Sequence, residues 1–297
     1  MLHPKQLLKL IGILLFLSIL MRIDRGKLVT HMSALNWGGV LLVYASTFII
    51  YAIKALRFQV LVKSAGLPMS RSASWKLCNI GVFLAVITPA KAGELGKAAY
   101  LKNAGMPLTK AVAMALLDRL FDIAAIGIIA AIGVGILFGW RWTALSLLAG
   151  GFLCATYMLL HKRTALATFT AFFRRHVALT AAKMGMVLGI TFVSWICYFL
   201  WTVAIARLVG IGTPVHILTA AFTITGILTF LPIAPSGLGT RDVALLYLLA
   251  PYGVTAEQSV ALAFLIFCML ILSGVPGLYY WYRGLVIDQR YSPSIAP

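Results

Sequence analysis

The chain has 297 residues, of which 62% are hydrophobic and only 11% are charged. Because soluble domains are about 25% charged, this composition excludes a soluble globular protein and indicates one transmembrane domain over residues 1–297. Lys and Arg total 25 against 7 Asp and Glu, an excess that in so apolar a chain is typical of membrane topology and anionic lipid contact, so we expect no nucleic-acid binding.

Apolar stretches long enough to span a bilayer, which takes about 20 residues, recur along the chain. They lie near 7–23, 38–56, 111–138, 142–160, 181–210 and 257–281. The first follows basic residues but has no small-residue cleavage site, so we expect it to remain as a span. Two further apolar stretches, 73–104 and 214–251, are interrupted.

Both interrupted stretches break in the same way. The first contains Pro, Gly and charge between Thr88 and Glu94, and the second contains them between Pro232 and Asp242. Backbone that is not helical is tolerated at membrane depth only where it is buried in protein or lines a wet cavity. The legs before each break are shorter than the roughly 20 residues of a span, which favours two re-entrant hairpins, although the second stretch could be extended into two full spans.

An internal comparison at an offset of 144 residues aligns Gly93 with Gly237 and Lys97 with Arg241. Each half of the chain then has the order span, span, hairpin, span, with repeat 1 over about 1–140 and repeat 2 over about 141–290. We therefore predict an all-α polytopic membrane protein with two inverted-topology repeats, each containing a re-entrant helical hairpin. This is the architecture of alternating-access carriers.

Basic residues in short loops predict the orientation. The strongest cluster lies in 161–183, and a second is expected in the loop after the 38–56 helix, at Arg57, Lys63, Arg71 and Lys76. These clusters place both termini in the cytoplasm. The 73–104 hairpin then enters from the cytoplasm and the 214–251 hairpin from the opposite side.

Ionisable residues within spans are rare and are candidates for function. Asp118 and Asp122 are four residues apart and share a helix face, as Glu94 and Lys97 do at three apart. Arg119 can reach Asp122 at the same spacing.

The second leg of each hairpin begins after a glycine-rich break, where free N–H groups attract anions. We expect Thr240 to cap the second of these helices. Basic residues near the two breaks add full charges, so we predict an anion site between the hairpins. Its candidate residues are Lys91, Glu94, Lys97, Asp118, Arg119, Asp122, Gly237, Gly239, Arg241 and Asp242.

A purely structural interpretation of these charges stays open. The pairs Glu94–Lys97 and Arg119–Asp122 would then neutralise each other and fix the first hairpin without a ligand. For Arg241, at a helix start beside two glycines, a functional role is favoured.

Motifs for a nucleotide, a metal protease or a nucleophilic serine do not occur. The four cysteines are scattered through apolar stretches with no C-x-x-C pair, which is typical of packing residues. We predict no cofactor, no metal and no catalytic residue.

The runs Pro89 to Glu94, Asp118 to Asp122 and Pro232 to Asp242 resemble the signature blocks of the lysylphosphatidylglycerol synthase transmembrane-region family. The resemblance covers about 75–285. It implies a stand-alone protein that moves a lipid across the cytoplasmic (inner) membrane of a prokaryote. The soluble aminoacyl-transferase domain of the bifunctional family members has no counterpart in this sequence.

Our first hypothesis is a lipid flippase or carrier whose substrate has an anionic headgroup: an aminoacylated phospholipid or a polyprenyl-phosphate-linked sugar. The alternative is a membrane-embedded enzyme or an accessory subunit that acts on a lipid-linked substrate, with Glu94 or Asp242 as a general base. Homodimerisation and association with a lipid-modifying enzyme both stay open.

Overall fold

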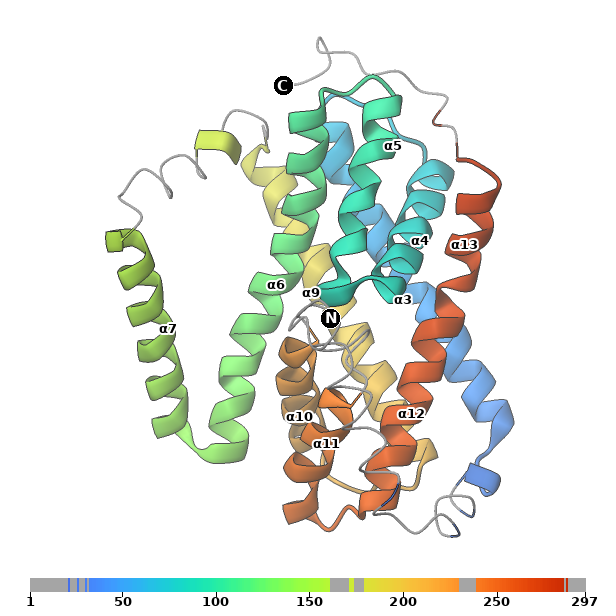
Figure 1. The fold of residues 1–297 in the computed structure, drawn as a ribbon, viewed down its shortest axis with the longest axis vertical. Helices are drawn as coiled ribbons and strands as arrows, with labels where there is room; N and C mark the ends of the chain where they lie inside the picture. Colours follow the sequence, from blue (N-terminus) through green and yellow to red (C-terminus); the bar gives the residue numbers. More distant parts are fainter. Residues whose placement is uncertain are drawn as a thin grey trace, which may run out of the picture.

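The computed structural model describes residues 32–160, 171–173, 179–229, 239–285 and 287, together with residues 21, 26 and 30. Within these ranges the chain is helical and has no strand, which confirms the all-α class (Figure 1). The elements of the first half are α3 (Trp37–Ser64), α4 (Arg71–Ile87), the 3-10 helix η1 (Pro89–Gly96), α5 (Lys97–Asn103) and α6 (Leu108–Phe138). Those of the second half are α7 (Trp140–Leu160), α9 (Ala181–Leu208), α10 (Val215–Leu228), α11 (Thr240–Leu249), the 3-10 helix η3 (Ala250–Tyr252), α12 (Ala256–Ser273) and α13 (Val275–Tyr282).

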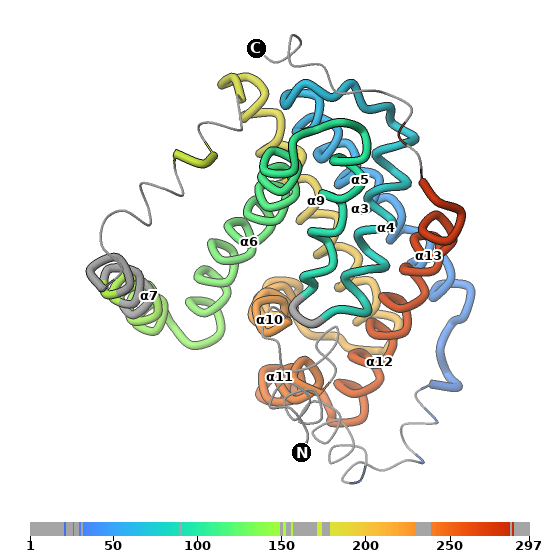
Figure 2. Tube along the Cα trace, turned by 45° about the horizontal axis from the view of Figure 1, so that its top comes forward, coloured from blue at the N-terminus to red at the C-terminus, as the bar shows by residue number. Residues whose placement is uncertain are grey.

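Four of the described helical segments are long and apolar enough to cross a membrane: α3, α6, α9 and the continuous α12–α13 segment Ala256–Tyr282. They match four of the predicted spans, and α7 forms where the 142–160 stretch predicted a helix. The span predicted at 7–23 lies outside the described residues. Figures 1 and 2 show α7 at one side of the bundle, beside α6.

The first interrupted stretch forms a helical hairpin from α4, η1 and α5. Ser70 caps α4 by accepting the Ala73 N–H at 3.1 Å, and the helix ends at Thr88 before Pro89 opens η1. The Thr88 hydroxyl accepts the Gly93 N–H at 2.7 Å and donates to the Leu84 carbonyl at 2.6 Å. A Cβ atom at Gly93 would overlap that carbonyl oxygen, so only glycine allows η1 to lie this close to α4.

The second interrupted stretch forms α10 and α11, which pack against each other. Its break at 230–238, including the predicted site residue Gly237, lies outside the described residues. The expected cap at Thr240 is wrong, because Thr240 is the first residue of α11 and Gly239 is its N-cap. Gly239 has a φ of 80°, which favours glycine, and its N–H donates to the Asp242 carboxylate at 2.7 Å.

The two hairpins lie in opposite halves of the bundle in Figure 1, with α4 and α5 above and α10 and α11 below. Each packs against the long helical segment of the other half: α4 against α13, and α10 against α6. Two buried apolar clusters result. One joins the end of α3 to α4, α5 and the start of α6, and the other joins α9, α10, α11 and α12.

One topological prediction is wrong. Helix α3 does not end near residue 56 but continues to Ser64, so Arg57 is not a loop residue. Its side chain is 1% exposed inside the bundle. A single charge ended the apolar stretch in the sequence, whereas in the structure carboxylates on another helix neutralise that charge.

Candidate functional site

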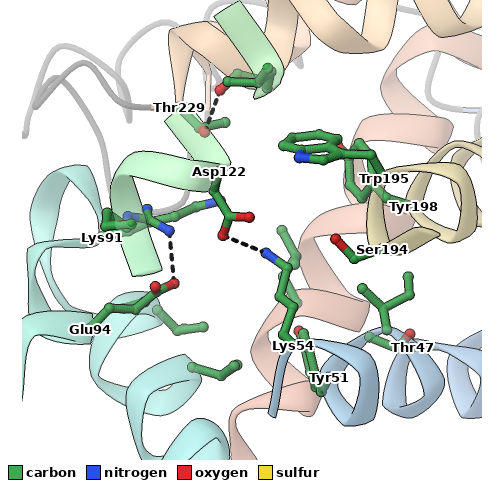
Figure 3. Close-up of a pocket in the computed structure, with 18 of the residues that line it drawn as sticks. Thr47, Tyr51, Lys54, Lys91, Glu94, Asp122, Ser194, Trp195, Tyr198 and Thr229 are labelled. Carbon is green, nitrogen blue, oxygen red and sulfur yellow. Dashed lines mark hydrogen bonds and ion pairs between the residues drawn. The ribbon is translucent and has the colours of Figure 1, made fainter. Parts of the chain in front are cut away.

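A cavity lies between the two hairpins and encloses about 1360 Å³, including its open mouth. The surrounding elements are α3, α4, η1, α5, α6, α9, α10, α11 and α12. Charged side chains from α3, η1, α5 and α6 line one part, and aromatic side chains from α9 line another (Figure 3). Concave sites with apolar and aromatic walls and a few converging polar groups are typical ligand sites.

Asp118 and Asp122 are the centre of an ion-pair cluster on α6. Arg57 Nη2 lies 2.8 Å from Asp118 Oδ1, and Arg57 Nη1 lies 2.7 Å from Asp122 Oδ1. Lys97 Nζ is 2.7 Å from Asp118 Oδ2, and Lys54 Nζ is 3.0 Å from Asp122 Oδ2. Three cations therefore surround two carboxylates, and each carboxylate is held by two of them.

Arg57 joins three helices through this cluster. Besides the two carboxylates, its guanidinium donates to the Asp118 carbonyl at 3.0 Å and to the Thr191 hydroxyl of α9 at 3.2 Å. A buried charge is tolerated only when its hydrogen-bonding capacity is used. The planar guanidinium with its five N–H donors meets that need in a way that a lysine would not.

A second ion pair lies at the cavity wall, between Glu94 of η1 and Arg119 of α6. Glu94 Oε1 and Arg119 Nη1 are 3.0 Å apart, and both side chains keep some exposure. Lys91 of η1 also lines the cavity. Its φ of 55° is in the left-handed region, which a residue with a side chain adopts at a cost of about 1–3 kcal/mol.

The pairings predicted from spacing along the chain are wrong. Glu94 pairs with Arg119 instead of Lys97, and Asp122 pairs with Arg57 and Lys54 instead of Arg119. Each charge finds its partner on another element because the helices are packed together. The Lys97 ammonium reaches Asp118 over the ring of Phe58, at 4.4 Å from the ring centroid.

Lys54 and Arg57 are the members of the charged cluster that the sequence analysis did not include among the candidate site residues. They are three residues apart on α3 and share one face, which is the spacing that grouped Glu94 with Lys97. Two basic residues at this spacing in one apolar segment, and two acidic residues at a similar spacing in another, would have been the signal. In Figure 3 the Lys54 and Asp122 side chains point toward each other across the cavity wall.

Arg241 at the start of α11 has a different environment. Its side chain lines the cavity although the residue is only 4% exposed. Nη2 donates to the Ala263 carbonyl of α12 at 2.9 Å, whereas Nε is buried without a hydrogen-bond partner. Among the described residues no carboxylate oxygen lies within 4.0 Å of this guanidinium, since the neighbouring Asp242 binds the Gly239 N–H instead.

The cavity therefore has an excess of positive charge. Its described lining includes five basic side chains (Lys54, Lys91, Lys97, Arg119, Arg241) and three acidic ones (Glu94, Asp118, Asp122). Nine of the ten predicted site residues are described; seven of them line this cavity, and Gly239 and Asp242 instead shape the turn that presents Arg241.

All seven of these predicted lining residues carry a charged side chain. Lys54, which was not predicted, is the eighth charged residue on the cavity wall. The predicted residue Gly237 lies outside the described ranges. Within those ranges no group of three His, Cys, Asp or Glu side chains is arranged to hold a metal ion.

The aromatic part of the wall comes from α9, at Trp195, Tyr198 and Trp201. Trp195 and Tyr198 meet edge to face at 5.3 Å, and Tyr198 stacks on Trp201 at 6.1 Å. The indole Nε1 of Trp195 is buried without a hydrogen-bond partner, as is the hydroxyl of Thr47 across the cavity. Figure 3 shows both residues at the wall, on the side away from Glu94.

Comparison with protein families gives one match that covers most of the chain. The profile of the lysylphosphatidylglycerol synthase TM region matches residues 6–276. The chain belongs to this family. Membership confirms the resemblance carried by the motifs around Glu94, Asp118 and Arg241, and together with the apolar helices it identifies a multi-pass membrane protein related to lipid handling. Comparison with curated proteins and with solved structures gives no match.

Proposed function

We propose that this member of the lysylphosphatidylglycerol synthase TM region family is a carrier that moves a phosphate-bearing lipid across the membrane. The headgroup would occupy the cavity between the α4–α5 and α10–α11 hairpins, while the tails stay in the bilayer. The observation that carries the proposal is the Arg241 guanidinium, which lines the cavity, is almost fully buried and has no carboxylate partner among the described residues.

A buried cation without a counter-ion is costly, because burial removes its hydration. Arg57 also carries a buried guanidinium, but it avoids this cost because it binds two carboxylates. Among the described residues, the Arg241 guanidinium donates to one acceptor, the Ala263 carbonyl, and its buried Nε has no hydrogen-bond partner. An anionic group in the cavity would supply the missing partner, and a guanidinium matches the two oxygens of a phosphate with two parallel hydrogen bonds.

We also propose that the two halves are inverted repeats. Helices α3 and α9 both have 28 residues and begin 144 positions apart, at Trp37 and Ala181. The contacts between the halves support the same offset. Gly133 of α6 lies against Thr223 of α10, and Gly277 of α13 lies against Asn79 of α4. Position 79 lies 144 residues before position 223, and position 133 lies 144 residues before position 277. One contact therefore repeats the other with the roles of the two halves exchanged.

Such an exchange is what a pseudo-two-fold axis between the halves would produce. In a membrane, the hairpins would be re-entrant from opposite sides, with their breaks near the midplane beside the cavity. We keep the predicted orientation, with both termini in the cytoplasm of a prokaryote and the α4–α5 hairpin open to the cytoplasmic side. A headgroup bound at the interface of the repeats could then be exposed to either side in turn.

The test is lipid translocation by purified protein in liposomes that contain a fluorescent anionic phospholipid, followed by quenching with dithionite. We expect the protein to speed the exchange between leaflets, and Arg241→Gln to slow it about tenfold or more, because a hydrogen bond to a charged group contributes about 1.5–3 kcal/mol. Arg71→Gln is the matched control, since Arg71 is exposed at the first turn of α4.

Equal rates for wild type, Arg241→Gln and protein-free liposomes would contradict the proposal, provided that the protein is folded. Chromatography of the lipids after the assay separates movement from reaction. A chemically altered lipid would favour the alternative function, a membrane-embedded enzyme.

A further inference from the structure

The carboxylates of the cavity are all occupied. Glu94 is bound by Arg119, Asp118 by Arg57 and Lys97, and Asp122 by Arg57 and Lys54. Asp242 has a carboxylate oxygen without a partner, but the residue is fully buried behind the Gly239 turn and does not line the cavity. A cationic headgroup would therefore meet no free carboxylate on the described wall.

The cations of the cavity are in excess, and one of them is within easy reach of a ligand. The side chain of Lys54 is 30% exposed although it binds Asp122. Together with Arg241 it places positive charge on two sides of the same space. A ligand ammonium group in that space would be repelled, because like charges brought together at an interface are strongly unfavourable.

The unpartnered polar atoms of the wall indicate which groups the ligand must carry. Arg241 Nε and Trp195 Nε1 are both buried N–H donors without an acceptor, and the Thr47 hydroxyl is also unpartnered. Phosphate and hydroxyl oxygens accept hydrogen bonds, whereas an ammonium group can only donate. A ligand with acceptor oxygens can satisfy the two N–H groups, whereas an ammonium group cannot.

From these three observations we propose that the cavity selects lipids whose headgroup combines a phosphate with hydroxyl groups, such as glycerol or a sugar, and rejects headgroups that carry an ammonium group. The proposal rests on the proposed function and narrows its substrate: of the two lipid classes expected from the sequence, it excludes the aminoacylated phospholipids. The phosphate binds at Arg241, and the hydroxyl groups bind at Trp195 and Thr47.

The aromatic wall is the feature that could favour a cation, since Trp and Tyr faces attract ammonium groups. Here such a contact would compete with the Arg241 and Lys54 charges that line the same cavity. The same ring faces also accept the apolar face of a sugar. The presence of Trp195, Tyr198 and Trp201 is therefore consistent with a neutral, hydroxyl-rich headgroup.

The experiment is a binding competition between phosphatidylglycerol and its lysyl ester with identical acyl chains, read by native mass spectrometry of the purified protein. The two lipids share the phosphate and differ by an aminoacyl group with two ammonium groups. We expect phosphatidylglycerol to be retained about tenfold or more over the lysyl ester. Equal retention, or a preference for the lysyl ester, would overturn the proposal.

Two variants test which residues set the preference between phosphatidylglycerol and its lysyl ester. Lys54→Gln releases an oxygen of Asp122 toward the cavity, so the share of bound lysyl ester should rise about tenfold, whereas Lys63→Gln on the exposed end of α3 should leave it unchanged. Trp195→Phe keeps an aromatic side chain and removes the N–H donor, so it should weaken the binding of phosphatidylglycerol without strengthening that of the lysyl ester. An unchanged ratio in Lys54→Gln would show that the cavity charges do not set the preference.

Binding and movement are read separately, so the two proposals fail in different ways. If phosphatidylglycerol binds preferentially but neither lipid crosses the bilayer in the dithionite assay, the carrier function is wrong and the selectivity stands. If both lipids bind and cross equally, the carrier function stands and the selectivity is wrong.

Discussion

Lys97 of α5 donates to Asp118 of α6 at 2.7 Å, and both side chains are almost completely buried. This contact attaches the first hairpin to the longest described helix through charge as well as through packing. The stem of Lys97 passes over Gly81 of α4, where a Cβ atom would lie 3.2 Å from its Cδ atom. The absence of a side chain at Gly81 therefore leaves the lysine its path to the carboxylate.

Removal of one partner of this pair should be strongly destabilising. Lys97→Met and Asp118→Asn should each lower stability by about 3–5 kcal/mol, because a buried charge loses its partner. The double variant should lose less than the sum, which a double-mutant cycle of thermal unfolding in detergent measures. Lys102→Met, on the exposed surface of α5, is the control. Additive losses would contradict an energetic coupling of Lys97 to Asp118.

Arg57 should not be replaceable by lysine. Arg57→Lys keeps the charge but cannot contact Asp118, Asp122 and Thr191 together, so a loss of about 3–5 kcal/mol is expected, as for a broken buried pair. Lys63→Arg, the reverse exchange at an exposed position of the same helix, should be neutral. The measurement is the unfolding temperature of the two variants. A wild-type unfolding temperature for Arg57→Lys would show that the planar guanidinium of Arg57 is not needed for these contacts.

Gly93 should tolerate no side chain. Gly93→Ala places a methyl group against the Leu84 carbonyl and the Thr88 hydroxyl, so it should cost more than the roughly 1–3 kcal/mol of ordinary overpacking. Gly127→Ala on α6 meets open space and should be neutral or slightly stabilising. The comparison requires only expression yield, monodispersity and unfolding temperature. Equal behaviour of the two variants would show that η1 can move away from α4.

The proposed inverted topology has a direct test. Pro68, between α3 and α4, and Gly212, between α9 and α10, are exposed and lie 144 positions apart. In a background without the native cysteines, Pro68→Cys and Gly212→Cys should react with a membrane-impermeant maleimide from opposite sides of sealed vesicles. Inverted repeats place equivalent loops on opposite faces. Labelling of both from the same side would contradict the inversion.

The elements were largely predictable because their signals are local. Apolar length gave α3, α6, α9 and the α12–α13 segment, and Pro and Gly at 89–93 predicted the break between α4 and α5. The shared face of Asp118 and Asp122 could also be predicted from helical periodicity.

The partners of these charges could not be predicted in the same way. Spacing along one helix shows which residues share a face, but not which helix that face meets. It therefore offered Lys97 as a possible partner of Glu94, whereas the partner in the structure is Arg119. Arg57 was missed for a related reason. A charge in an apolar stretch indicates the end of a span until its counter-ions are known, and here they lie on α6.

The unequal charge balance of the two halves has a mechanical consequence. Separation of α5 from α6 would break the contact of Lys97 with a carboxylate, whereas separation of α11 from α12 at Arg241 would break one hydrogen bond to a carbonyl. Ion pairs in a low-dielectric interior resist separation far more than a single hydrogen bond does. The first half would thus act as the stationary frame, and the α10–α11 hairpin as the part that yields when a ligand enters or leaves.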